Sequence, residues 1–202
     1  MTNTDTTCRQ CGTCCKKGGP SLHLEDKPLI DTGTIAARDL FTIRAGELAH
    51  ENIQGGVRPA ETDIIKIKGR GGQWTCRFLV EKDNRCGIYD HRPLECRALN
   101  CQDTRQIEKI YDTNRLTRKD LLENVPGLWD VIQEHQHHCD YGRIYKLREQ
   151  LKRNPADKTA AQNLRELIAY DSLIRERLSK KGNMDPDLMD FLFGRPLTAR
   201  AE

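Results

Sequence analysis

The chain has 202 residues, of which 37% are hydrophobic, 5% aromatic and 31% charged, and its formal net charge is +3. This length favours one domain with an appended segment, and no apolar stretch approaches the roughly 20 residues that span a bilayer. The opening MTNTDTTCRQ lacks the basic and apolar runs of a signal peptide, so we expect a cytoplasmic protein with reduced thiols. The small positive charge gives little reason to expect a nucleic-acid partner, and it would turn slightly negative if the cysteines bound metal as thiolates.

Four of the nine cysteines lie in CRQCGTCC, residues 8–15. Cys8, Cys11 and Cys14 form a C-x2-C-x2-C motif, whose spacing lets a tight turn point successive sulfurs at one metal centre. Cys15 follows Cys14 directly, and neighbouring side chains generally diverge. We therefore expect Cys15 to serve a second centre or the far side of a polynuclear one.

Short elements are predicted for the stretch that follows. The segment TIAARDLFTIRAGELAHEN (34–52) predicts a helix with Thr34 as its N-cap. Residues 63–68 and 73–79 alternate like strands, and the glycines between them predict a hairpin. Residues 85–90 predict a third short strand, and Pro93 indicates the start of a helix over residues 92–99.

A second group of cysteines consists of Cys76, Cys86, Cys96 and Cys101. Gaps of nine residues are typical of loops or hairpins, so these thiols should come from different elements that fold over the N-terminal loop. Four local and four distant thiolates suffice for two four-ligand sites that share a neighbourhood. The alternative is that they are small buried hydrophobic residues, and so dense a cluster in a cytoplasmic protein favours metal.

Three residues of CGIYDHRPLECR (86–97) are candidate cofactor-binding residues. Arg92 and Arg97 could donate hydrogen bonds to the sulfurs or offset thiolate charge, and Tyr89 lies beside them in the sequence. The alternative for the two arginines is an ordinary surface salt bridge with Asp90 or Glu95. The sequence leaves both interpretations open.

From about residue 103 the pattern becomes helical. Thr117 and Asp120 have the spacing of an N-terminal capping pair. Asn154 and Asp185 each precede a proline, which predicts that each caps a helix.

Within this helical half, EHQHHCDYG (134–142) raises a further candidate. On a helix that begins near Gly127, His135 and Cys139 face inward, and a break is expected near Gly142. His135 and Cys139 are therefore candidate additional metal ligands. The alternative, a buried cysteine beside a satisfied core histidine, is the one that we favour.

These elements predict an α+β protein with a small cysteine-rich, metal-stapled head that contains short strands, followed by a helical C-terminal segment. We place the metal-binding domain at residues 1–102 and the helical extension, which packs on the head or on a protein partner, at residues 103–202. Catalytic residues are not identified, because the chain has no nucleophile elbow, P-loop or dinucleotide fingerprint.

The cysteine pattern resembles the YkgJ-type cysteine-cluster family, which is described as zinc- or iron-chelating. The resemblance covers residues 8–101 and rests on CRQCGTCC, CRFL and CGIYDHRPLECR. It implies a metal-binding fold and no particular reaction. The cysteine core is also similar to that of flagellin lysine N-methylases, which implies an iron–sulfur centre in part of the wider family. About 60 residues separate Cys15 from Cys76, a longer insert than is expected of compact members, and the helical tail has no counterpart.

Ligand spacing and the softness of thiolate favour an iron–sulfur cluster, of the 4Fe-4S type, over zinc. The leading hypothesis is a metal-cluster protein that acts in electron transfer or as an accessory to a redox or methyl-transfer enzyme. A zinc-stapled interaction module is the first alternative, and an S-adenosylmethionine-dependent protein lysine methylase is the second. The sequence does not decide whether the protein is an enzyme.

Overall fold

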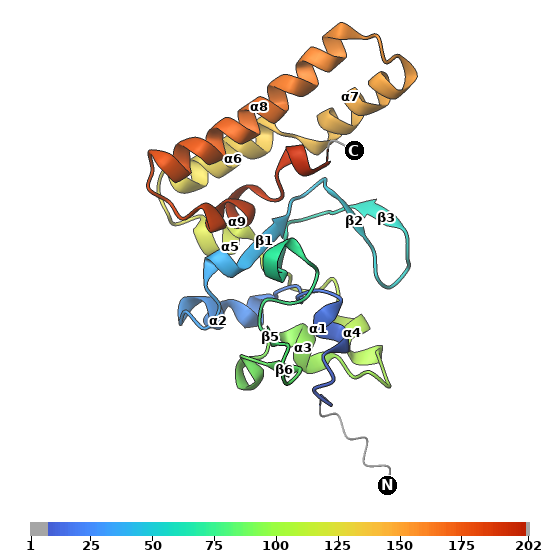
Figure 1. Ribbon diagram of the computed structural model, residues 1–202, viewed down its shortest axis with the longest axis vertical. Helices are drawn as coiled ribbons and strands as arrows, with labels where there is room; N and C mark the ends of the chain where they lie inside the picture. The colour runs from blue at the N-terminus through green and yellow to red at the C-terminus, as the bar shows by residue number, and fades with distance from the viewer. Residues whose placement is uncertain (1–7, 201–202) are drawn as a thin grey trace. The chain divides into compact units, whose positions relative to one another are not determined.

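The computed structural model describes residues 8–200 and divides them into two compact units (Figure 1). Unit 1 takes residues 8–40 and 64–116, and unit 2 takes residues 41–63 and 117–200. The opening residues 1–7, for which we expected no targeting segment, lie outside the described residues. The predicted boundary between residues 102 and 103 falls inside unit 1, and the division into domains 1–102 and 103–202 stays a prediction.

Unit 1 is built from short elements joined by turns. Its helices and strands are α1 (Thr13–Lys16), η1 (Leu24–Asp26), α2 (Lys27–Asp31), η2 (Ala37–Asp39), β4 (Ile64–Ile67), η3 (Arg70–Gly72), β5 (Leu79–Val80), β6 (Arg85–Cys86), η4 (Tyr89–His91), α3 (Leu94–Ala98) and α4 (Arg105–Ile110). β5 and β6 pair antiparallel, with Leu79 opposite Cys86. The apolar residues that it buries include Leu22, Ile35, Ile65, Ile67, Leu79 and Leu116.

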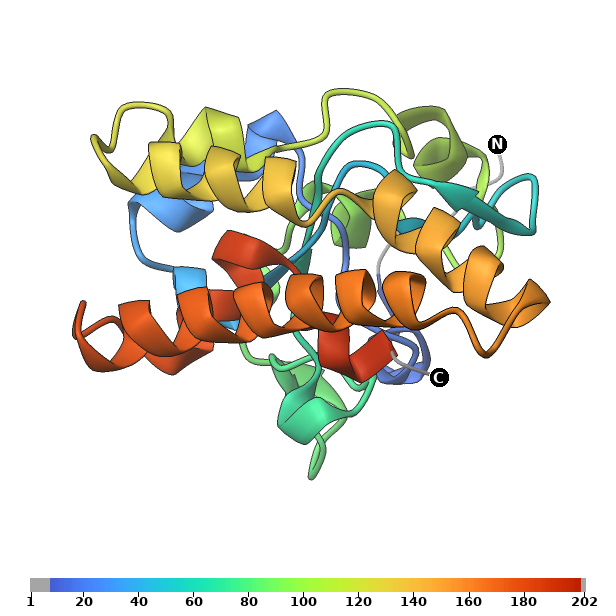
Figure 2. The same ribbon diagram turned by 90° about the horizontal axis from the view of Figure 1, so that it is seen from above.

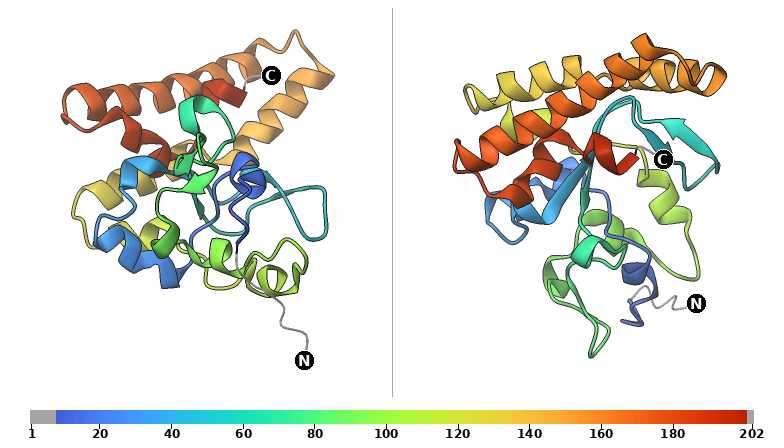
Figure 3. Two further views of the ribbon diagram at one scale, coloured as in Figure 1. Left: turned by 60° about the horizontal axis from the view of Figure 1, so that its bottom comes forward. Right: turned by 45° about the horizontal axis from the view of Figure 1, so that its top comes forward.

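Unit 2 contains the longer helices. Its elements are β1 (Leu40–Ile43), whose first residue belongs to unit 1, β2 (Leu48–His50), β3 (Val57–Pro59), α5 (Arg118–Leu122), α6 (Leu128–His138), α7 (Tyr141–Arg153), α8 (Lys158–Lys180), η5 (Pro186–Leu188), α9 (Met189–Phe193) and η6 (Leu197–Arg200). β2 and β3 form an antiparallel hairpin (Figure 3). α6 and α7 run along α8 (Figure 2), and a buried cluster there includes Cys139, Tyr141, Ile144, Leu147 and Leu167.

The predicted α+β class is confirmed: short antiparallel strands lie in the N-terminal half and helices in the C-terminal half. The strand predicted over 63–68 and the helix predicted over 92–99 are present as β4 and α3. Thr117 and Asp120 form the predicted capping box of α5, and Asp185 caps η5. α8 begins later than predicted, because Asp157 rather than Asn154 accepts the capping hydrogen bond, from the amide of Ala160.

The helix predicted over residues 34–52 is wrong. The structure places η2, β1 and β2 in this stretch. Gly46 has a φ of +82°, in the left-handed region where glycine is favoured and a helix cannot continue. Thr42 and Ile43, which are β-branched and fit a strand better than a helix, lie in β1.

The strand predicted over residues 73–79 is also wrong for most of its length. Only Leu79 lies in a strand, and the turn at residues 69–76 closes through an isolated bridge between Gly69 and Cys76. The backbone amide of Cys76 donates its hydrogen bond to the carbonyl of Cys15 instead of to a neighbouring strand. The strand predicted over residues 85–90 is present only at Arg85 and Cys86.

The predicted break after α6 occurs at Cys139 and Asp140, slightly before Gly142. Asp140 caps α7 by accepting the amide of Arg143 at 2.8 Å. The guanidinium of Arg44, which is fully buried, lies 4.4 Å from the centre of the Tyr141 ring and donates to the carbonyl of Cys139 at 3.2 Å. This cation satisfies a carbonyl at the C-terminus of α6, where the helix dipole favours positive charge. No helix within residues 8–200 is both long and apolar enough to cross a membrane.

His135 is fully buried on α6, and its Nε2 lies 2.8 Å from Oδ1 of Asp171 on α8. The carboxylate also accepts the guanidinium of Arg175 and the amide of Leu197. An ionised carboxylate only accepts hydrogen bonds, so Nε2 carries the proton, and Nδ1 is buried without a partner among the described residues. Burial lowers the pKa of His135 to about 4, although Asp171 opposes the shift.

We expect this histidine to make unit 2 less stable in mild acid. Below the ordinary histidine pKa of about 6.5, His135 is protonated in the unfolded chain and stays neutral in the folded protein. The free energy of unfolding therefore falls as the pH drops from about 6.5 towards 4. The loss attributable to His135 should reach about 2 kcal/mol at pH 5. Urea unfolding followed by far-UV circular dichroism at pH 7 and pH 5 measures it. His135→Gln removes the titration, so equal pH dependence in the two proteins would contradict the assignment.

Candidate metal centre

All eight cysteines of the predicted site belong to unit 1 and are free thiols, not disulfides. They come from several short elements: α1, β6, α3 and the loops and turns beside them (Figure 1). Cys76 is buried, Cys11 and Cys101 are exposed, and the others are half-buried, namely Cys8, Cys14, Cys15, Cys86 and Cys96. The five half-buried thiols are partly covered by the chain and still accessible to solvent.

Gly12 lies within the N-terminal cysteine motif, at the turn immediately before α1. Its φ of +73° lies in the left-handed region, and the chain after it turns into the helix that carries Cys14 and Cys15. The sulfurs of Cys14 and Cys15 lie 4.0 Å apart, so they do not diverge as the sequence led us to expect. Two thiolates bound to one tetrahedral ion by bonds of about 2.3 Å lie at a similar separation.

The second group of cysteines is joined to this loop through the backbone and through Asn84. The amide of Cys76 donates to the carbonyl of Cys15 at 2.6 Å. Asn84, in the turn before Cys86, has a φ of +52°, and its Oδ1 would lie 2.9 Å from a Cβ at Gly12. The turn between β5 and β6 therefore rests against the bend of the N-terminal loop, and only glycine fits there.

The thiol of Cys8 accepts a hydrogen bond from the backbone amide two residues further along the chain. The amide of Gln10 lies 3.4 Å from the sulfur of Cys8. The backbone amides of Thr13, Phe78 and Ile88 act to lower the pKa values of Cys11, Cys76 and Cys86, respectively. An amide that points at sulfur stabilises the thiolate over the thiol and fixes the direction of the side chain.

Cys14 and Cys15 share a proton unequally. The hydrogen bond from Cys15 lowers the pKa of Cys14 to about 6. The same hydrogen bond raises the pKa of Cys15, and burial and the negative charges of Cys14, Cys76 and Cys96 raise it further. The directions of the two shifts favour Cys14 over Cys15 as the thiolate of this pair.

The distant thiols repel one another as thiolates. Burial raises the pKa of Cys76, Cys86 and Cys96, and in each case the charges of other cysteines, Cys14 among them, raise it further. Cys8 acts on Cys86 in the same way, and Cys14 acts on Cys11. Each of seven predicted thiols therefore lies close enough to at least one other for their charges to interact, and Cys101 lies exposed on the turn between α3 and α4.

The predicted cofactor-binding residues occupy different positions around these thiols. The guanidinium of Arg92 stacks on the ring of Tyr89, 3.8 Å from its centre, and its charge acts on Cys86 to lower that pKa. Its Nε is buried and has no hydrogen-bond partner among the described residues. Arg97 lies 3.9 Å from the carboxylate of Asp26, not in either of the salt bridges considered from the sequence. Arg92 is the one of the three whose charge faces a candidate ligand.

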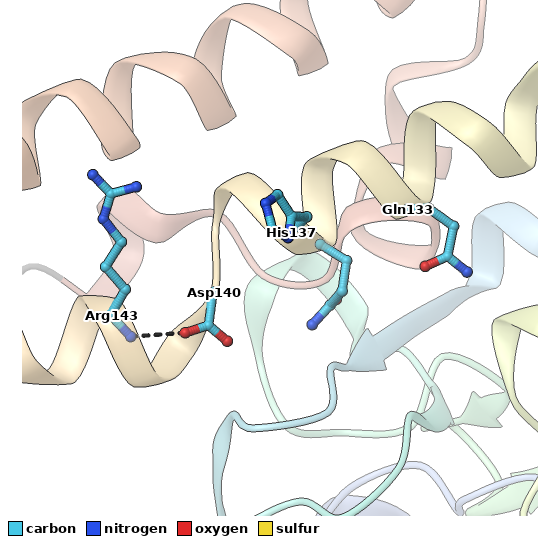
Figure 4. A pocket seen from close by; sticks show the side chains of 5 residues that line it. Gln133, His137, Asp140 and Arg143 are labelled. Carbon is cyan, nitrogen blue, oxygen red and sulfur yellow. Dashed lines mark hydrogen bonds between the residues drawn. The ribbon is translucent and has the colours of Figure 1, made fainter.

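His135 and Cys139 belong to unit 2. Cys139 is fully buried in the core cluster of α7 and α8, where its sulfur lies 3.9 Å from the carbonyl of Leu167. An open polar pocket nearby is lined by Gln133 and His137 of α6, by Asp140 and by Arg143 of α7 (Figure 4), together with Gln136. Neither His135 nor Cys139 lines it, and both make the contacts of core residues.

Two groups of functional interest escaped the sequence analysis. Asn84 has no motif of its own, although its place two residues before a cysteine was a weak signal. His23, Asp26 and Glu95 are buried, and His23 contacts both carboxylates; no spacing in the sequence indicates this, because Asp26 and Glu95 are far apart along the chain.

One of three comparisons with known proteins gave a match, and it covers the region that carries these cysteines. Residues 7–120 match the model of a family named CxxCxxCC, described as "Putative zinc- or iron-chelating domain". The chain belongs to this family. The match spans both groups of cysteines and confirms the resemblance seen in the sequence. Searches of curated proteins and of solved structures found no match.

The donor set fits a soft metal ion. Thiolates are the ligands that zinc and iron–sulfur centres prefer, and a cation would offset the burial and mutual repulsion that raise the pKa values of Cys15, Cys76, Cys86 and Cys96. As they stand, no three cysteine, histidine or acidic side chains within residues 8–200 are gathered closely enough to hold one ion. Binding therefore requires side chains to rotate on the short elements that carry them.

Gly12→Ala should weaken metal binding. The new methyl group would meet Asn84 and the residue would have to keep a φ of +73°, at a cost of about 1 kcal/mol or more. Gly33→Ala is the matched control, because Gly33 has a φ of +75° and nothing within 4 Å of its would-be Cβ. Zn²⁺ affinity, measured by competition with a chelator, should fall only in Gly12→Ala. Equal losses in the two variants would contradict a role for the Gly12–Asn84 contact.

Cys86→Ser should lower the metal content of the protein, whereas Cys139→Ser should lower its stability. Cys86→Ser removes a thiol that faces the others, so we expect the amount of metal bound after purification to fall. Cys139→Ser buries a hydroxyl in an apolar core and should cost about 1–3 kcal/mol of stability with no loss of metal. Elemental analysis and urea unfolding separate the two. Loss of metal from Cys139→Ser would identify Cys139 as a ligand.

Proposed function

We propose that unit 1 holds a thiolate-bound iron–sulfur centre, of the 4Fe-4S type, and that the protein acts in one-electron transfer or as an accessory to a redox or methyl-transfer enzyme. The observation that carries the proposal is that unit 1 holds eight free thiols from two separate stretches of chain, which are joined where the amide of Cys76 donates to the carbonyl of Cys15, beside the Cys14 and Cys15 sulfurs 4.0 Å apart. When bound, such a cluster supplies a site that takes up and releases one electron.

The chain's own residues suit this role. Cys8, Cys11, Cys14 and Cys15 would provide ligands from one loop, and Cys76, Cys86, Cys96 and Cys101 from separate elements. Amides that donate to sulfur reduce its electron density, which is one way in which a protein sets the potential of such a centre. Several of these sulfurs are half-buried, so an electron would have only a short path to the surface.

The zinc alternative is favoured by a different observation. β5 and β6 have two residues each, and α1 and α3 have four and five, so little regular structure holds the ligand-bearing segments in place. A closed zinc site would supply folding free energy to such a unit. In this version the helices of residues 103–202 bind a protein partner. The lysine methylase alternative stays a hypothesis.

Purification without oxygen should decide between these versions. We expect a brown protein that contains iron and acid-labile sulfide and shows broad visible absorbance from sulfur-to-iron charge transfer. Air or a strong chelator should bleach it. Double replacement of Cys14 and Cys15 by serine is the control and should abolish the colour. A colourless protein with stoichiometric zinc would overturn the iron–sulfur proposal, and a metal-free protein would overturn chelation itself.

A further inference from the structure

Two buried carboxylates connect α3, which carries Cys96, to the segment that follows the N-terminal loop. Oε2 of Glu95 accepts the amide of Ser21 at 2.7 Å, and Oδ1 of Asp26 accepts the amide of Leu94 at 2.8 Å. Pro93 precedes the helix and has no side-chain acceptor, so Asp26 satisfies an amide that α3 leaves open at its N-terminus. The two hydrogen bonds run in opposite directions and fasten the two segments together.

His23 completes this connection. Its backbone amide donates to Oδ2 of Asp26 at 3.0 Å, and its Nδ1 lies 2.8 Å from the carbonyl of Thr113, to which only an N–H can donate. Its Nε2 lies 3.6 Å from Oε1 of Glu95, and neither atom has another partner among the described residues. A bare lone pair there would face a carboxylate, so the geometry favours a second proton on the imidazole and an ion pair.

Lys66 supplies a second positive charge. Its ammonium donates to the hydroxyl of Ser21 at 3.2 Å, and its charge acts on Glu95. The buried carboxylates of Asp26 and Glu95 are thus balanced by His23 and Lys66, together with Arg97, which lies 3.9 Å from Asp26. A balanced, hydrogen-bonded set of charges holds one geometry, whereas the loss of one member leaves a buried charge unpaired.

We propose that Glu95 and Asp26 are positioning residues for Cys96, an inference that rests on the proposed metal-binding function. α3 has only five residues and cannot hold its own direction. Glu95 is adjacent to Cys96 in this helix, and Leu94, whose amide Asp26 accepts, is two residues away. The two carboxylates therefore set where the sulfur of Cys96 lies relative to the loop of Cys14 and Cys15.

The test uses Co²⁺ alone as the probe, added to the reduced full-length chain, because thiolate-to-cobalt absorbance reports the number and geometry of sulfur ligands. We expect Glu95→Ala and Asp26→Asn to bind Co²⁺ 10- to 100-fold more weakly than the wild type, the range seen when groups that orient metal ligands are lost. The charge-transfer absorbance per bound ion should also fall. Glu95→Gln keeps an oxygen for the amide of Ser21 and should retain part of the affinity.

Asp171→Asn is the matched control. Asp171 is also buried, faces a histidine and accepts a backbone amide, but it belongs to unit 2. This variant should lower the melting temperature and leave the Co²⁺ spectrum and affinity unchanged. If the Glu95 and Asp26 variants behave like Asp171→Asn, including the milder Glu95→Gln, the positioning role is overturned while the proposed function stands. A wild type that shows no thiolate-to-cobalt absorbance would overturn both.

Discussion

Thiolates repel one another, and burial adds a further cost to each negative charge. In unit 1 both effects act on Cys76, Cys86 and Cys96, and the thiolate of Cys14 acts on all three. A protein can hold such groups together stably as neutral thiols or around a cation, and only the second arrangement makes them a single binding site. Because the metal would remove the repulsion that the fold creates, binding free energy and folding free energy are coupled in unit 1.

The remaining structure of unit 1 serves to hold short segments in place. Each ligand-bearing element is too short to be stable alone, so its direction is set by groups from elsewhere in the unit. Asn84 rests against Gly12, the carbonyl of Cys15 holds the amide of Cys76, and Asp26 completes the N-terminus of α3. Polar contacts of this kind have definite directions, which apolar packing lacks, and a metal site needs its ligands directed to within a fraction of an ångström.

The sequence predicted what local chemistry decides. The capping box at Thr117, the cap at Asp185 and the break after α6 are present because they depend on neighbouring residues. The helix predicted from residue 34 failed because β-branched residues and Gly46 outweigh its apolar spacing. The density of the cysteines predicted that they share one region of the fold, and all eight lie in unit 1, while their assignment as ligands stays a prediction. The ion pair of His23 and Glu95 was not, because charged residues are ordinarily exposed and their meeting depends on the whole fold of unit 1.

The interleaving of the two units has a consequence for synthesis on the ribosome. Unit 1 is interrupted in the sequence by residues 41–63, which belong to unit 2. It resumes at residue 64 and ends at residue 116. At a synthesis rate of about 5–20 residues per second, Cys76 is made several seconds after the cysteines of residues 8–15. During that interval they would lack the distant ligands that we propose for them, so metal delivery and the avoidance of oxidation would depend on timing as well as on affinity.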